Sequence, residues 1–321
     1  MQSISMRHTY VCLHLWLASF SIAFLPQASF IHYSVGNQLL STKWADERIQ
    51  NFINVANVTI VIPAYNEEER IGPTLQSYSS YMRARLGESS KIVVVDDGST
   101  DGTCDLVSGS FNDIELLSLP TNNGKGAAVA AGIDHVCNFH PSCNAILVAD
   151  ADGSAGIENI DTMLEAFINV LEGETATTVR PTVDDYPPVV VVGKRESASS
   201  SPARLLLRWG FRMTVSLLAG DLKVSDTQCG FKLFTPSAAQ TLYTNLNLKG
   251  WTHDVEVLYR ACNLFQHTIR EVPIQWEDRE GSKLVKSPGG VVGISFIMLC
   301  QVLWLRIAYE MEWWTAALHQ D

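Results

Sequence analysis

The stretch Ala145-Ile146-Leu147-Val148-Ala149-Asp150-Ala151-Asp152-Gly153-Ser154 decides the fold, because an apolar run ends there in two carboxylates. A short apolar run bounded by a turn signal is typical of a buried strand. Residues two apart on a strand point the same way, so Asp150 and Asp152 can converge on one hard cation. A bound diphosphate would supply further oxygen ligands. The stretch therefore predicts a Mg²⁺ or Mn²⁺ site at the end of a buried strand.

Two other interpretations of the same residues compete with a metal site. Asp-x-Asp-Gly-Ser can form a turn that satisfies its own backbone groups. A calcium-binding loop also begins with two aspartates at this spacing, but it requires a glycine where Ala155 stands and a glutamate where Asp161 stands. The turn stays open as an alternative, and the calcium loop does not fit.

Further apolar runs on both sides alternate with helical stretches, which is the pattern of βα units around a mainly parallel sheet. Helices are expected to begin near Glu67, Thr103, Lys125 and Ile157. In such sheets the ligand crevice lies outside the carboxyl ends of the strands. The runs that predict strands are 59–62, 92–95, 114–119, 145–149 and 189–192.

Polar segments follow the first two predicted strands. Tyr65, in the segment after the first strand, could stack on a base. After the second strand, Asp96 and Asp97 precede a glycine and residues that can cap a helix, which leaves one aspartate able to accept hydrogen bonds from a base or ribose. Acidic residues also suit helix N-termini, so plain turns and caps stay open for both segments.

The loop Asn122-Asn123-Gly124-Lys125-Gly126 places one cation at the start of a predicted helix. Such a place suits a diphosphate, because amides at the helix end and a lysine can both contact it. The spacing and the residue after Lys125 differ from those of a Walker loop. Taken alone, this loop is only a weak sequence signal for a diphosphate site.

Composition narrows the class of partner. The 321 residues are 46% hydrophobic and 18% charged, which fits a globular domain with additional apolar segments and makes a lipid bilayer a candidate partner. The net charge of −11, without blocks of Lys and Arg, argues against nucleic acid. Seven scattered cysteines without a C-x-x-C pair favour reduced thiols in a cytosol-facing domain.

The apolar segments suggest how the chain meets a membrane. Residues 1–32 are expected to form an uncleaved single-pass anchor, with a cleaved signal peptide as the alternative, and 33–57 a linker. A catalytic domain is expected over 58–310 and a tail over 311–321. Within that domain, 203–220 and 291–309 are candidate membrane-interfacial helices, the first with an arginine stripe that includes Arg204.

Several motifs together carry a family resemblance. The segments 61–67, 94–103, 123–126 and 150–154 stand in the order and spacing of family 2 glycosyltransferases. A second set of motifs resembles the dolichyl-phosphate β-glucosyltransferases in particular. That set comprises Gly193-Lys194-Arg195, Asp226 to Lys232, Gly250-Trp251 with Asp254 and Glu256, Glu271 to Ile274, and Gly281-Ser282-Lys283. The Gln-x-x-Arg-Trp motif of processive synthases is absent, which argues against polysaccharide synthesis.

The resemblance implies a GT-A fold, a divalent cation and inversion at the anomeric carbon. Within it, Tyr65, Glu67 and Asp97 are expected to hold uridine, Lys125 to lie near the diphosphate, and Asp150 and Asp152 to hold the metal. The full set expected to contact the nucleotide sugar and metal is Pro63, Tyr65, Glu67, Asp96, Asp97, Lys125, Gly126, Asp150, Ala151 and Asp152.

The acceptor decides which catalytic groups are needed. A polyprenyl phosphate has a second pKa of about 6, so it is mostly ionised at neutral pH. It can therefore attack the sugar without a catalytic base. Cationic groups that steer the phosphate are expected instead, namely Lys194, Arg195 and Arg204. Asp254 stands where relatives with hydroxyl acceptors keep a catalytic acid, and it either orients glucose or favours a helix start. The predicted catalytic residues are thus Asp152, Asp254 and Arg195.

The predicted reaction transfers glucose from UDP-glucose to dolichyl phosphate. The product would be dolichyl β-D-glucosyl phosphate, a lipid-linked donor for N-glycan precursor assembly. The resemblance and the reduced thiols indicate the cytosolic face of the endoplasmic reticulum membrane. Two alternatives stay open: a polyprenyl-phosphate mannosyltransferase that uses GDP-mannose, and a non-catalytic membrane-bound scaffold that binds a nucleotide sugar.

Overall fold

The computed structural model describes most of the chain between Glu47 and Trp314. All of the described residues belong to one compact unit. The predicted anchor 1–32, most of the segment 203–220 and the motif 281–283 lie outside the described residues. The described residues are 47–52, 57–87, 89–174, 186–196, 210, 213, 215, 222–277, 279 and 290–314.

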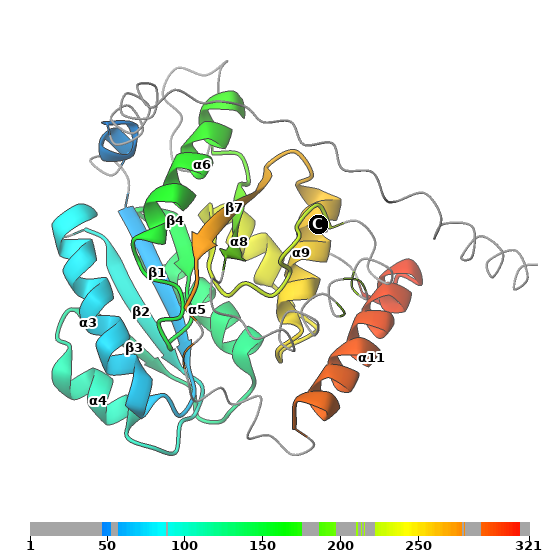
Figure 1. Ribbon diagram of the computed structural model, residues 1–321, viewed down its shortest axis with the longest axis horizontal. Coiled ribbons are helices and arrows are strands. Elements are labelled where there is room, and N and C mark those ends of the chain that lie inside the picture. The colour runs from blue at the N-terminus through cyan, green and yellow to red at the C-terminus, as the bar shows by residue number, and fades with distance from the viewer. Residues whose placement is uncertain are drawn as a thin grey trace, which may run out of the picture. The chain divides into compact units, whose positions relative to one another are not determined.

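A seven-stranded sheet with the order β3-β2-β1-β4-β6-β5-β7 organises the domain (Figure 1). All of its pairings are parallel except those of β6, which is antiparallel to both neighbours. The prediction of a mainly parallel sheet is therefore confirmed. The strands are β1 (Asn57–Ala64), β2 (Lys91–Asp96), β3 (Ile114–Ser118), β4 (Cys143–Val148), β5 (Val190–Glu196), β6 (Lys232–Phe234) and β7 (Ile269–Gln275).

Helices pack on both faces of the sheet because both faces are apolar. Along β1, Ile60 and Ile62 point into one hydrophobic cluster and Val61 into the other, as the two-residue period of a strand requires. The first cluster includes side chains of α3 (Glu68–Arg85), α4 (Thr103–Ser110) and α6 (Asn159–Glu174). The second includes side chains of α5 (Lys125–Phe139), α8 (Pro236–Tyr243), α9 (His253–Leu264) and α11 (Gly290–Glu310).

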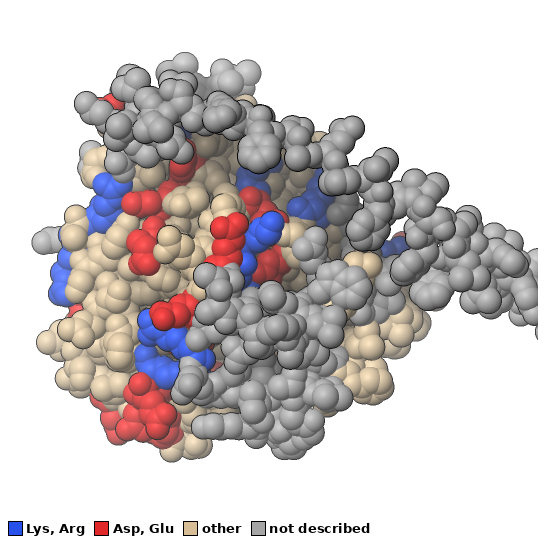
Figure 2. Space-filling model, in the orientation of Figure 1, with Lys and Arg blue, Asp and Glu red and all other residues tan. Residues whose placement is uncertain are grey.

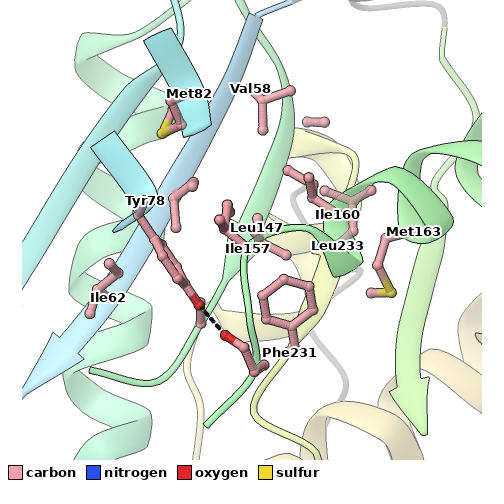
Figure 3. Packing of buried hydrophobic residues seen from close by; sticks show 14 of the residues in the cluster. Val58, Ile62, Tyr78, Met82, Leu147, Ile157, Ile160, Met163, Phe231 and Leu233 are labelled. Carbon is pink, nitrogen blue, oxygen red and sulfur yellow. Dashed lines mark hydrogen bonds between the residues drawn. The ribbon is translucent and has the colours of Figure 1, made fainter. Parts of the chain in front are cut away.

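Tyr78 ties the first cluster to the predicted metal turn. Its ring lies among buried apolar side chains, and its hydroxyl donates a hydrogen bond of 2.8 Å to the backbone oxygen of Ala155 (Figure 3). Burial, then the charges of Asp150 and Asp152, raise the pKa of this phenol, so it stays protonated as a donor. The core thus holds the chain directly after Asp152 in place.

Two strands of the sheet were not predicted from the sequence. The strand β6 has only three residues, too few to give an apolar period, and β7 carries two charges and a proline within seven residues. Tertiary pairing forms both, since β6 lies between β4 and β5 and β7 pairs with β5. The predicted helix starts agree with the structure to within two residues.

The helix α11 lies beyond α9, on the opposite side of the domain from α3 and α4 (Figure 1). It covers the whole predicted interfacial segment 291–309 and one further residue at each end. Within the described part of the chain, no helix has the length and apolar character needed to span a membrane. Several large apolar side chains along this helix and just after it are exposed, namely Phe296, Ile297, Leu303, Trp304, Ile307, Met311 and Trp313.

A buried charge network fastens α11 to α9. The Arg260 guanidinium and the Glu256 carboxylate are both fully buried and lie 2.7 Å apart. Tyr309 of α11 joins them, because Arg260 donates to its hydroxyl at 2.7 Å and the hydroxyl donates to Glu256 at 3.0 Å. Backbone oxygens of Leu242, Thr244 and Asn245 satisfy the rest of the guanidinium.

We expect Glu256→Ala to lower the free energy of unfolding by about 3–5 kcal/mol, because it leaves the Arg260 charge buried without a partner. Tyr309→Phe removes one hydroxyl and should cost only about 1 kcal/mol. Urea denaturation of the purified protein in detergent, followed by tryptophan fluorescence, measures both. Equal losses for the two variants would show that the buried charge does not dominate this network.

Candidate active site

The ends of three neighbouring parallel strands meet at one edge of the sheet. In β1 and β2, Ala64 pairs with Asp96, and β4 pairs with β1 on its other side. Asp150 and Asp152 follow β4 directly, so they share this edge with the segments that follow β1 and β2. The sheet therefore gathers residues from three distant parts of the sequence, as predicted.

The two predicted metal ligands point out of the core while the residue between them points in. Ala151 is buried in the first hydrophobic cluster, whereas the side chains of Asp150 and Asp152 are 23% and 25% exposed. Each carboxylate has a cation beside it. Lys125 Nζ lies 2.5 Å from Asp150 Oδ1, and an Arg70 nitrogen lies 3.6 Å from Asp152 Oδ2.

This donor set suits a hard divalent ion. Two carboxylates that share one edge and keep partial access to solvent offer oxygen ligands, and Mg²⁺ or Mn²⁺ is commonly held by one or two carboxylates together with substrate phosphates. The Asp152 carboxylate also accepts a hydrogen bond of 3.0 Å from the Ser154 amide, which fixes its orientation. Asp150 and Asp152 would hold such an ion.

Gly230 supports Asp150 from the opposite side. A β-carbon at position 230 would overlap the Asp150 carboxylate, so the glycine leaves room for this side chain in its present position. Gly230 belongs to the motif Asp226 to Lys232, which leads into β6. The short antiparallel strand that the sequence did not predict therefore brings this motif to the turn that carries Asp150 and Asp152.

Asp97 holds the neighbouring loop. Its two carboxylate oxygens accept hydrogen bonds of 2.8 Å each from the amides of Asn123 and Gly124. This pairing fixes the loop that carries Lys125. The structure thus gives Asp97 a positioning role, whether or not it also contacts a nucleotide.

Asp96 is buried, and one of its two carboxylate oxygens can still accept a hydrogen bond. Its Oδ2 accepts a hydrogen bond of 3.1 Å from the Ser99 amide. Its Oδ1 is buried and has no N–H or O–H donor among the described residues. Buried acceptors are nearly always paired, so Oδ1 suits a donor on a bound ligand.

The segment after β1 holds its own acidic group in a salt bridge. Both oxygens of Glu67 accept hydrogen bonds from Arg70, at 2.7 and 2.8 Å. Arg70 thereby bridges Glu67 and Asp152. Pro63 is buried at the end of β1, and Tyr65 is half-buried just beyond it, in the loop that faces this edge.

Lys125 is surrounded by negative charge. Burial alone would lower the pKa of its ammonium group, but Asp150 and Asp254 outweigh burial and raise it, so the lysine stays charged. Its Nζ also lies 5.7 Å from the ring centre of Trp251. The Gly126 amide donates to the Lys249 oxygen at 2.8 Å, and Gly126 packs against His253, so Gly126 joins the loop before α9 to α5.

Asp254 lies in a buried ion cluster. Lys232 Nζ donates to its Oδ1 at 2.6 Å, and His253 Nε2 lies 3.3 Å from the same oxygen. Burial would raise the pKa of this carboxyl, but His253, Lys232 and Lys125 together lower it to about 2. A carboxylate with this pKa is a weak proton acceptor, so the geometry favours orientation of neighbouring cations over base catalysis.

Arg195 is held rigidly at the end of β5. Asp226 accepts from its Nε at 2.6 Å, from Nη2 at 2.7 Å and from its backbone amide at 3.1 Å. The guanidinium also lies 5.3 Å from the ring centre of Trp276. Glu271 in turn fixes Asp226 by accepting its amide at 2.7 Å. Lys194 is exposed, and Arg204 lies outside the described residues.

On the face that Figure 2 shows, acidic and basic side chains lie next to one another in mixed groups. The candidate site likewise contains acidic and basic side chains next to one another. Sequence reasoning missed its cations Arg70 and Lys232. Arg70 follows Glu67 by three residues on a predicted helix, a spacing typical of an ion pair and the signal that could have identified it. Lys232 gave no such signal, because its partner Asp254 is 22 residues away.

Comparisons with known proteins show the family to which the chain belongs. The family model described as Glycosyl transferase family 2 matches residues 59–240. A dolichyl-phosphate β-glucosyltransferase of Trichomonas vaginalis is 38% identical over 70% of this chain, which spans 65% of that protein. The enzymes of Saccharomyces cerevisiae and Homo sapiens that bear the same name are 32% and 33% identical, over 79% and 71% of this chain and 76% and 69% of their own.

Solved structures show the same fold. Glucosyl-3-phosphoglycerate synthase of Mycobacterium tuberculosis, in complex with phosphoglyceric acid, matches with a TM-score of 0.55 and 18% identity over 88% of both chains. A structure of that enzyme with Mn²⁺, UDP and glucosyl-3-phosphoglycerate matches equally well. The fold is therefore the GT-A-like α/β fold predicted from the sequence. The chain belongs to glycosyl transferase family 2 and, within it, to the dolichyl-phosphate β-glucosyltransferases.

Proposed function

We propose that this glycosyltransferase moves glucose from UDP-glucose to dolichyl phosphate with inversion, giving dolichyl β-D-glucosyl phosphate. One observation carries the proposal beyond the family: Asp150 and Asp152 stand at the carboxyl end of β4 between Lys125 and Arg70. Such an arrangement suits a divalent ion and a diphosphate together, because the carboxylates attract the ion and the cations attract the phosphates.

The donor nucleotide occupies the edge formed by β1 and β2. Tyr65 offers a ring for stacking, and the unpaired Oδ1 of Asp96 offers an acceptor for an N–H of uracil or a ribose hydroxyl. Asp97 fixes the loop before α5, and Arg70 fixes Glu67. These contacts form a rigid site for uridine that is built before any ligand enters.

The leaving diphosphate gains negative charge as the sugar bond breaks. A Mg²⁺ or Mn²⁺ ion held by Asp150 and Asp152 would neutralise part of that charge. Lys125 stays protonated and lies beside Asp150, so it can contact the same phosphates as a fixed cation. Because these groups are already oriented, little reorganisation is needed during the reaction.

The acceptor phosphate needs orientation more than it needs a base. Dolichyl phosphate is mostly ionised at neutral pH, as phosphate monoesters with a second pKa near about 6 are. Arg195 is the best-placed cation for it, because Asp226 occupies the Nε side of the guanidinium and leaves Nη1 for an anion. Lys194 and Arg204 are proposed to assist. Asp254 is proposed to hold Lys232, and not to accept a proton.

We further propose that the chain works at the cytosolic face of the endoplasmic reticulum membrane, with residues 1–32 as a single-pass anchor. The cysteines of the described part of the chain are free thiols, which suits a reducing compartment. The exposed apolar side chains of α11, Trp304 and Phe296 among them, suit contact with a lipid bilayer. A bilayer contact beside the site would deliver a lipid-bound acceptor.

We expect Asp152→Asn to lower kcat for transfer from UDP-glucose to dolichyl phosphate by about 10²-fold or more, because one oriented group that stabilises developing charge is commonly worth that much. Radiolabelled glucose recovered in the lipid fraction measures it. Asp113→Asn, an exposed change outside the site, should leave turnover intact. Transfer from GDP-mannose alone, or no transfer by the unaltered protein, would reject the proposal.

We expect Asp226→Asn to weaken the use of dolichyl phosphate selectively. A hydrogen bond to a charged group contributes about 1.5–3 kcal/mol, so kcat/KM for dolichyl phosphate should fall about tenfold or more as Arg195 loses its fixed orientation. The KM for UDP-glucose should stay within about twofold. Initial rates with each substrate varied in turn test this. An equal rise in both KM values would contradict the assignment of Arg195 to the acceptor site.

We expect Trp304→Ser to raise the KM for long-chain dolichyl phosphate in vesicles by about tenfold, since burial of a large apolar side chain is worth about 1.5–3 kcal/mol. The KM for a short, water-soluble polyprenyl phosphate should not change. Phe139→Ser removes a more exposed aromatic side chain from α5, away from α11, and serves as the control. The same effect on both acceptors, or none on either, would contradict the bilayer contact.

A further inference from the structure

A second cluster of ionisable side chains lies at the other end of α5, away from the candidate active site. It consists of Glu115 on β3 and the two histidines His135 and His140. Lys125 begins α5 at the active site, and His140 follows its last residue. At 1.5 Å per helical residue, the two ends are about 20 Å apart. The cluster is therefore separate from the site that Asp150 and Asp152 form.

The end of the helix brings the two histidines together. Five residues apart on a continuous helix, their side chains would point about 140° away from each other. His140 is instead the residue at which the helix ends, with φ −121° and ψ 64°. This change of direction turns its ring back, so that the ring centres of His135 and His140 lie 5.7 Å apart.

Three ligand atoms converge on one point in the cluster. His135 Nε2 and His140 Nε2 lie 3.0 and 3.1 Å from the same Glu115 oxygen, Oε2. One ligand atom from each of the three residues lies within 4.8 Å of the other two. In a tetrahedral zinc site with bonds near 2.0–2.1 Å, neighbouring ligand atoms are about 3.3 Å apart. The cluster thus approaches the spacing of a zinc site without rearrangement of the backbone.

Access and charge also suit a cation. The side chains of Glu115, His135 and His140 are 43%, 24% and 15% exposed, which leaves room for an ion and a water ligand to enter. A glutamate carboxyl ordinarily has a pKa of about 4.3, so Glu115 can offer a charged oxygen ligand at neutral pH. Phe139 lies against the His135 ring, with centres 4.9 Å apart, and limits its movement.

A hydrogen-bonded arrangement without metal is the competing interpretation. Two neutral imidazoles can each donate Nε2–H to the shared carboxylate oxygen. That arrangement would also join the edge strand β3 to the end of α5. The two interpretations can be separated by measurement, because removal of the negative charge weakens metal binding but keeps an oxygen acceptor for both histidines.

We propose that Glu115, His135 and His140 bind a divalent transition-metal ion, Zn²⁺ foremost, with water as the fourth ligand. Two imidazoles and one carboxylate form a ligand set that zinc proteins use, whereas Mg²⁺ prefers oxygen ligands alone. The ion would fasten β3 to α5 and would raise the thermal stability of the domain. It would take no part in glucosyl transfer.

Zinc titration of the full-length, untagged protein tests the proposal. Isothermal titration calorimetry with ZnCl₂, in detergent and with excess Mg²⁺ to occupy the oxygen site, should give one Zn²⁺ per chain. His135→Gln and His140→Gln should each raise the dissociation constant at least about tenfold, since even the loss of an outer-shell partner commonly costs 10–100-fold. His267→Gln, on an exposed residue outside the cluster, should leave it unchanged.

Glu115→Gln separates the two interpretations, because it keeps the acceptor oxygen and removes the charge. It should weaken Zn²⁺ binding at least about tenfold and abolish the rise in melting temperature that Zn²⁺ causes in the unaltered protein. The visible absorption of bound Co²⁺, used as a spectroscopic probe, should decrease in parallel. No Zn²⁺ binding by the unaltered protein, or equal affinity in all four variants, would overturn the proposal.

Discussion

The charge balance at the end of β4 is the constraint on which the rest of the site depends. Asp150 and Asp152 project from one edge of the sheet because Ala151 between them is buried, and Lys125 and Arg70 stand beside them. Neighbouring carboxylates repel each other unless positive charge lies near. Two fixed cations therefore offset this repulsion and hold the pair in place, and the same cations can contact the phosphates of a donor. The metal, nucleotide and acceptor sites that we propose all depend on this arrangement.

Long-range contacts hold that arrangement rigid. Asp97 holds the loop that carries Lys125 by accepting two backbone hydrogen bonds from it. Gly230, before β6, leaves room for the Asp150 side chain. Arg195 is fixed by Asp226, which is itself fixed by Glu271. Each functional cation thus has an acidic partner that orients it. This construction suits a reaction in which charge shifts between phosphates and no proton has to be removed from the acceptor.

The sequence predicted the parallel core of the sheet, the helix starts and the turn after β4, because apolar runs and turn residues are local signals. It did not predict β6, whose three residues form a strand only through pairing with β4 and β5. Nor did it predict Lys232 as the partner of Asp254, since that ion pair depends on how β6 packs against α9. Local patterns located the carboxylates of the site, while tertiary packing chose most of their partners.

The central claim is that Asp150 and Asp152 hold a divalent ion against the diphosphate of the donor. Electron paramagnetic resonance of Mn²⁺ tests it most directly, because the free ion gives a sharp spectrum that broadens when the ion is bound. The account predicts that UDP strengthens Mn²⁺ binding to the unaltered protein, and that a variant with Asp150→Asn and Asp152→Asn loses this UDP-dependent binding. Unchanged UDP-dependent Mn²⁺ binding in that variant would contradict the account.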